Sequence, residues 1–131
     1  FVEAVAAFDR ELPVITMAAT ALERAAAAHP HPLVREIYAD RAYNDDGTLV
    51  ARGTPGAVIH DAEEAADRVL RMLAEGALTS INGAKVPVKP ETVCVHGDGP
   101  EALHMAETLR TRLERAGVRV ESFRPRTPEP A

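Results

Sequence analysis

The sequence is poor in cysteine and in aromatic residues. It has one cysteine, no tryptophan and only 4% aromatic residues among 131 positions. A single cysteine excludes an internal disulfide bond, and the scarcity of aromatic residues leaves Ala, Val, Leu and Ile to form the core. The hydrophobic content of 46% is sufficient for one domain built around one core.

The sequence also lacks long apolar runs and an excess of positive charge. No stretch approaches the length that a membrane-spanning helix needs. The formal net charge is -5, which argues against nucleic acid or an anionic membrane as a partner. Cys94 lies within an apolar run, where a buried and unreactive thiol is expected. These features together predict a cytoplasmic protein in a reducing environment.

Strand and helix patterns alternate along the chain, which predicts an α/β fold with a mainly parallel sheet covered by helices. The expected strands are Leu12–Met17, Leu33–Tyr38, Thr92–Val95 and Val118–Phe123. The expected helices are Phe1–Phe8, Ala21–Ala28, the segment between Asp61 and Gly76, and Glu101–Ala116. Asn82-Gly83 predicts an antiparallel hairpin that joins Leu78–Ile81 to Lys85–Val88.

The segment from Ala39 to His60 is too rich in glycine, proline and acidic residues to form a helix. Within it, residues 44–47 have the composition of a turn. Its apolar residues, among them Tyr43 and Ile59, indicate an ordered loop rather than a disordered one.

The stretch Thr92–Pro100 gives the strongest indication of a functional site. A strand runs into His96-Gly97-Asp98-Gly99, and a helix follows. In α/β folds, ligands bind at the carboxyl ends of the strands. His96 and Asp98 could therefore be general acid/base groups or metal ligands, or His96 could simply be satisfied by a carboxylate at a strand end.

A second group of polar residues follows the strand Leu33–Tyr38. Asp40, Arg41 and Tyr43 could hold a substrate carboxylate through Arg41, or they could form a structural ion pair that fixes the loop. Glu36, within the strand, could point into a barrel interior, where a buried carboxylate would need a partner.

The pattern Gly97-x-Gly99-x-x-Ala102 matches a dinucleotide-binding fingerprint, and Glu121 ends the next expected strand. A pyrophosphate would then lie at the helix N-terminus. Asp98 weakens this interpretation because it would place a carboxylate in the anion site. The alternative is that the glycines only turn a strand into a helix.

Two segments, ADRAYNDDGTLVARGTPGAVI and CVHGDGP, occur in this order with the expected hairpin between them. They resemble the LamB/YcsF family, described as the A subunit of the prokaryotic ATP-dependent 5-oxoprolinase. The resemblance implies a distorted β/α barrel similar to polysaccharide deacetylases. Because family members are about twice as long, residues 1–123 would be the C-terminal part of one barrel domain, and 124–131 a Pro-rich tail.

The resemblance also implies a function, namely the ATP-dependent ring opening of 5-oxo-L-proline (pyroglutamate) to L-glutamate, together with subunits B and C. ATP would activate the lactam, and ATP itself would be bound either by this chain or by a partner subunit. No residue is assigned as a metal ligand. The implied catalytic residues are His96, Asp98 and Glu36. The implied binding residues are Asp40, Arg41, Tyr43 and Arg52 for the substrate, and Gly97 and Gly99 for the cofactor.

Two other functions stay open at this point. One is a nucleotide-binding α/β module built on Gly97 and the residues that follow it. The other is an inactive barrel fragment, which would need the N-terminal half or a second copy of the chain to cover its exposed strand edges.

Overall fold

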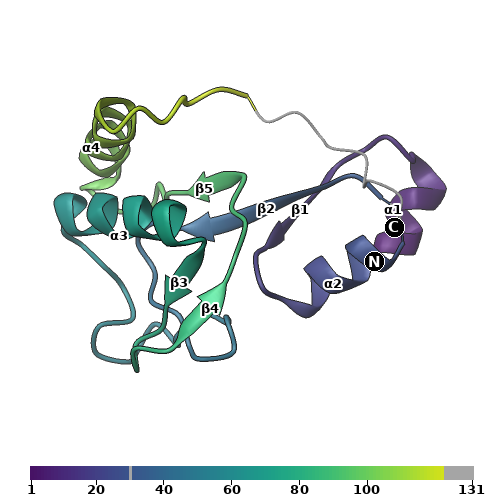
Figure 1. Cartoon of the computed structure of the whole chain (residues 1–131), viewed down its shortest axis with the longest axis horizontal. Helices are drawn as coiled ribbons and strands as arrows, with labels where there is room; N and C mark the ends of the chain where they lie inside the picture. The colour runs from purple at the N-terminus through teal and green to yellow at the C-terminus, as the bar shows by residue number, and fades with distance from the viewer. Residues whose placement is uncertain (30, 123–131) are drawn as a thin grey trace.

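The computed structural model describes residues 1–29 and 31–122 (Figure 1). The helices are α1 (Val2–Phe8), α2 (Ala21–Ala28), α3 (Ala62–Glu75) and α4 (Ala102–Arg115). The strands are β1 (Val14–Met17), β2 (Leu33–Tyr38), β3 (Ala77–Thr79), β4 (Lys85–Pro87) and β5 (Thr92–Cys94). No helix in these two ranges is long and apolar enough to span a bilayer. The tail expected at 124–131 lies outside the described residues.

Three of the expected strands form one parallel sheet in the order β1-β2-β5. Val14 lies opposite Leu33 at one end of the sheet, and Tyr38 lies opposite Cys94 at the other. The hairpin is confirmed as a separate antiparallel pair, in which Leu78 lies opposite Val86. The structure therefore confirms an α/β arrangement with mainly parallel strands and one hairpin.

The capping signals explain where two of the helices begin. Thr20 Oγ1 accepts the backbone N–H of Glu23 at the start of α2, and Asp61 Oδ1 accepts that of Glu64 at the start of α3. These bonds satisfy donors that a helix leaves free in its first turn. Gly76 then ends α3 in the left-handed conformation, with φ at 61°, which glycine adopts without steric cost.

The two faces of the sheet have different surroundings. Side chains alternate along a strand, so Ile37 points to one face and Glu36 and Tyr38 to the other. Ile37 is fully buried in a core that also contains Val69 of α3 and Leu109 of α4. On the opposite face Glu36 and Tyr38 are half-buried, and Ile15 of β1 is 47% exposed.

The long segment after β2 is ordered, as its apolar residues predict. Tyr43 forms a β-bridge with Leu49, and Arg41 forms one with Val58. Gly47, at the turn between them, has a φ of 83°, and a Cβ there would lie 3.0 Å from the Cβ of Ala19. Only glycine combines this conformation with so close an approach, and the loop is thereby fixed beside the carboxyl end of β1.

Two predictions at the end of the chain are wrong. Residues 118–122 form no strand, and in the described part of the chain β5 is the last strand at that edge of the sheet. The sequence pattern also places Leu103, Ala106, Leu109 and Leu113 together on one apolar helix face, but Leu103 is 70% exposed. Met105, Leu109 and Leu113 lie four residues apart and form the buried stripe instead.

Candidate functional site

A histidine and an aspartate meet at the carboxyl end of the parallel sheet. Asp40 follows β2 and His96 follows the neighbouring strand β5, so both lie at the same edge. His96 Nδ1 lies 2.7 Å from Oδ2 and 2.9 Å from Oδ1 of Asp40. In the tautomer that fits this contact, Nδ1–H donates to the carboxylate, which leaves Nε2 free to accept or give a proton.

The surroundings of this pair restrict its geometry. Asp40 is 8% exposed. The ring of Tyr38 stacks on His96 with the centroids 5.7 Å apart and an angle of 29° between the planes. A histidine held by a carboxylate on one side and an aromatic ring on the other has little freedom to rotate, as a proton-transfer group requires.

Glu36 and Cys94 lie on the same face of the sheet as this pair. Burial raises the pKa of the Glu36 carboxyl, whereas the Tyr38 hydroxyl and His96 lower it. Burial also raises the pKa of the Cys94 thiol, with a further contribution from Glu36. A thiol whose pKa is raised is a poor nucleophile, which agrees with the unreactive cysteine expected from the sequence.

The pair opens into a cavity of about 250 Å³. Ile59 and Met105 supply an apolar part of the wall, and Arg41, Arg52 and Asp98 supply polar groups. An apolar cavity with a few converging polar side chains is the usual form of a small-molecule site.

Arg41 is the buried cation of this cavity. It is 7% exposed, and its Nη2 donates to the backbone carbonyl of Val50 at 2.7 Å. Its buried Nε has no hydrogen-bond partner among the residues that the structure describes. The bond to Val50 thus fixes the guanidinium group, whose positive charge lies beside the cavity that Arg41 lines.

Asp98 and Arg52 lie at the rim of the cavity. Asp98 Oδ2 is 4.0 Å from Nη1 of Arg52, with the side chains 73% and 56% exposed. A pair this exposed contributes little to stability. The partner of His96 inside the cavity is Asp40, while Asp98 is free to reach an incoming ligand.

Tyr43, which the resemblance suggests for substrate binding, lies in the core. It is 1% exposed, and its hydroxyl oxygen accepts the backbone N–H of Tyr38 at 2.7 Å. Burial raises the pKa of Tyr43 to about 12. In this position Tyr43 holds the end of β2 and does not line the cavity.

Tyr43→Phe should lower the free energy of unfolding by about 1–3 kcal/mol, because the Tyr38 amide would lose its buried acceptor. Urea denaturation of the purified chain measures this change. A variant as stable as the wild type but with a strongly raised KM for the substrate would instead make Tyr43 a substrate contact.

Gly97 and Gly99 lead from β5 into α4, and a Cβ at Gly97 would meet no protein atom within 4 Å. Asp98 and Glu101, the N-cap of α4, place carboxylates at the helix N-terminus, where they compete with an anion. Residues 118–122 also form no strand, so Glu121 cannot take the position that a dinucleotide ribose requires.

Metal binding finds no support in residues 1–29 and 31–122. Nowhere in these ranges are three or more His, Cys, Asp or Glu side chains grouped to hold an ion.

Sequence reasoning offered a strand-end carboxylate as a possible partner of His96 but did not identify it as Asp40, and it missed the cavity residue His60. The contact follows from the register, because Tyr38 lies opposite Cys94 and each polar residue comes two positions later. For His60, the only signal is its place directly after the apolar pair Val58-Ile59.

The comparisons with known proteins identify the family and agree with the fold. The family model described as the LamB/YcsF family matches residues 1–127. A protein of Bradyrhizobium diazoefficiens, named as a second A subunit of 5-oxoprolinase, is 46% identical over 118 residues, which are 90% of this chain and 46% of that protein. A protein of Pyrococcus horikoshii, named as the A subunit of 5-oxoprolinase, is 43% identical over 119 residues, 91% of this chain and 47% of that protein.

A solved structure is also similar, that of a lactam utilization protein from Thermus thermophilus. The TM-score is 0.82 at 40% sequence identity, and the match covers 93% of this chain and 48% of the other. The chain thus spans about half the length of the curated relatives that it matches. Because the family model matches residues 1–127 and the relatives are 43–46% identical, the chain is a member of the LamB/YcsF family.

Proposed function

We propose that this chain contributes the strand-end site of a 5-oxoprolinase that opens 5-oxo-L-proline to L-glutamate in an ATP-dependent reaction. The observation that carries the proposal is the Asp40–His96 pair, which lies with Arg41 in one small cavity. Relatives named as the A subunit of 5-oxoprolinase and a structural neighbour named for lactam utilization support the choice of a cyclic amide as substrate.

The cavity supplies the groups that this reaction needs. Arg41, which lines the cavity, binds the substrate carboxylate. ATP would first phosphorylate the lactam oxygen and leave as ADP, and Nε2 of His96 would take a proton from the water that attacks the activated carbon. When the ring C–N bond breaks, the same imidazole would return the proton to the departing nitrogen, which becomes the amine of glutamate. A second water would then hydrolyse the resulting acyl phosphate to the side-chain carboxylate and inorganic phosphate. Asp40 keeps the imidazole in the required tautomer and orientation.

Three further groups have supporting parts in this proposal. Arg52 and Asp98, at the rim, make contact with the substrate or with a neighbouring polypeptide when the site closes. Glu36, whose carboxyl has a raised pKa, lies behind His96 on the same face of the sheet and takes part in proton transfer.

We assign ATP binding to the partner subunits, expected to be subunits B and C. Asp98 and Glu101 place two carboxylates beside Gly97 and Gly99, where they would compete with a phosphate group. The dependence on ATP also favours the cytoplasm as the location.

The other half of a LamB/YcsF polypeptide is the partner that would complete the fold. The face of the sheet that carries Ile15, Glu36 and Tyr38 is not covered by a helix in the described part of the chain, and the relatives are about twice as long as the matched part. Covering this face would give a distorted β/α barrel similar to polysaccharide deacetylases, with Glu36, Asp40 and His96 inside it. A second copy of the chain is the alternative occupant.

Reconstitution tests the proposal. The chain would be co-expressed with the N-terminal half of a family member and with subunits B and C, and glutamate and ADP would be measured after addition of 5-oxoproline. Glutamate should form in the complete set and not when this chain is left out. A complete set that binds together but forms no glutamate, or one that works equally well without this chain, would refute the proposed function.

A further inference from the structure

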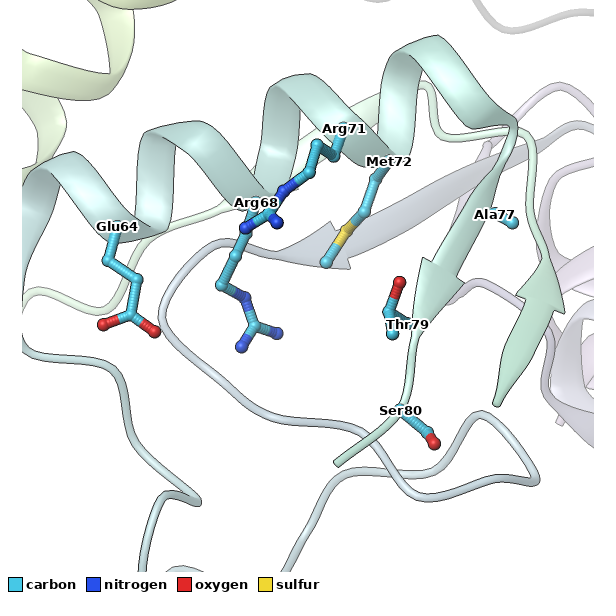
Figure 2. Close-up of a pocket in the computed structure, with 7 residues that line it drawn as sticks. All are labelled: Glu64, Arg68, Arg71, Met72, Ala77, Thr79 and Ser80. Carbon is cyan, nitrogen blue, oxygen red and sulfur yellow. The ribbon is translucent and has the colours of Figure 1, made fainter. Parts of the chain in front are cut away.

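A second cavity lies between α3 and β3 and shares no lining residue with the His96 cavity. Its volume is about 220 Å³. Figure 2 shows Arg68 extending from α3 into the space between the helix and β3, and the Thr79 hydroxyl pointing back toward the helix. Arg71, one turn further along α3, belongs to the same wall.

Arg68 is a positive charge that the surrounding protein holds but does not neutralise. Its Nη2 donates to the backbone carbonyl of Arg41 at 3.0 Å. Its buried Nε has no hydrogen-bond partner, and the side chain is in no ion pair, within the part of the chain that the structure describes. Burial lowers the pKa of this guanidinium, and the charge of Arg71 lowers it further.

Two more donors face the same space. The Nε of Arg71 donates to the backbone carbonyl of Asp67 at 3.4 Å, which leaves the end of its guanidinium fork for another acceptor. Thr79 Oγ1 accepts from Nζ of Lys85 at 2.8 Å, so its own O–H can donate into the cavity. Lys85 also adds positive charge nearby, although it is paired with Glu75.

One acid opposes this arrangement. Glu64 lies one turn before Arg68 and lines the cavity, and its charge partly offsets the lowering of the Arg68 pKa. Glu64 is exposed to solvent, whereas Nε of Arg68 is buried. A bound anion that reaches the half-buried Arg68 would be less screened there than Glu64 is, whereas Arg71 and Thr79 are exposed and would hold the anion from the solvent side.

We propose that this cavity binds a small tetrahedral oxyanion of the phosphate class, held by Arg68, Arg71 and the Thr79 hydroxyl. Guanidinium groups bind pairs of phosphate oxygens through two parallel hydrogen bonds, which a single lysine cannot do. A volume of about 220 Å³ has room for free phosphate but lies below the usual range for larger ligands. Inorganic phosphate is therefore the expected occupant, rather than the phosphate of a bound nucleotide.

Isothermal titration with inorganic phosphate, in buffers matched for ionic strength with sodium chloride, tests this site. The wild-type protein should bind phosphate saturably, and Arg71→Gln should weaken the affinity at least tenfold, about 1.4 kcal/mol. Arg110→Gln is the matched control, because Arg110 lies on the surface of α4 and pairs with Glu114. Absence of saturable binding, or equal affinity in Arg71→Gln, would overturn the proposal.

Three further titrations distinguish free phosphate from ATP as the ligand, and the cavity between α3 and β3 from the His96 cavity as the site. ATP should bind no more tightly than phosphate, and tighter binding of ATP would overturn the preference for the free ion. His96→Ala should keep the phosphate affinity, because a loss would place the anion in the other cavity. Arg68→Gln should abolish phosphate binding if circular dichroism shows that this variant is folded. If Arg68→Gln does not fold, the affinity of Arg71→Gln decides whether the site exists. None of these readouts depends on 5-oxoproline turnover.

Discussion

His96→Ala should lower the turnover of 5-oxoproline by about a hundredfold or more in the complete assembly, the usual scale for loss of a general acid/base. The His96 imidazole is the group in the cavity that a carboxylate holds in place, through contacts of 2.7 and 2.9 Å with Asp40, as proton transfer requires. Steady-state rates of glutamate formation measure the effect.

His104→Ala is the control for this prediction. His104 is an exposed residue on α4 and does not line the cavity, so its loss should leave turnover nearly unchanged. Asp40→Asn should lower turnover as well, because an amide can present its N–H to the imidazole and so favour the wrong tautomer. If His96→Ala folds and keeps full activity, the pair is part of the scaffold and the chemistry belongs to another polypeptide.

Ile37→Ala should lower the free energy of unfolding by about 2–5 kcal/mol, the range for large-to-small changes in a packed core. Ile37 is fully buried at the centre of the parallel sheet, below α3 and α4. Urea denaturation of the purified chain gives the difference in the free energy of unfolding. The dependence of that free energy on urea concentration should match the wild type.

Ile15→Ala is the matched control, since it removes the same atoms from the neighbouring strand on the other face. Ile15 is 47% exposed, so its loss should cost the isolated chain well under half as much. In the assembled enzyme the cost should rise, because the proposed second half of the barrel would cover this face. Equal losses for the two variants in the isolated chain would mean that both faces of the sheet are already packed.

The secondary structure could be predicted where the local signals were strong. Residues 33–38 form a strand with the predicted bounds, because β-favouring residues follow a proline at 32 and precede a polar loop. The capping box of Thr20 and Glu23 likewise places the start of α2 correctly. Local chemistry determines these features, so one sequence is sufficient to find them.

Features that depend on distant neighbours could not be predicted in the same way. Val118–Phe123 has the composition of a strand, but a strand needs a partner, and residues 118–122 have none beside β5 in the described chain. Asp40 and His96 are far apart in sequence, and their contact requires that β2 and β5 be adjacent. The same holds for Arg68, whose burial depends on the loop that folds against α3.

The central claim is that the cavity beside the Asp40–His96 pair binds 5-oxoproline, and the NMR signals of the histidine rings test it most directly. In the assembled protein with ¹⁵N-labelled histidine, 5-oxoproline would be added stepwise and the ring resonances followed by NMR. If the cavity binds the lactam beside the Asp40–His96 pair, the His96 resonances should shift saturably while those of His104 stay in place. Saturable binding of 5-oxoproline that leaves the His96 resonances unmoved would contradict the account.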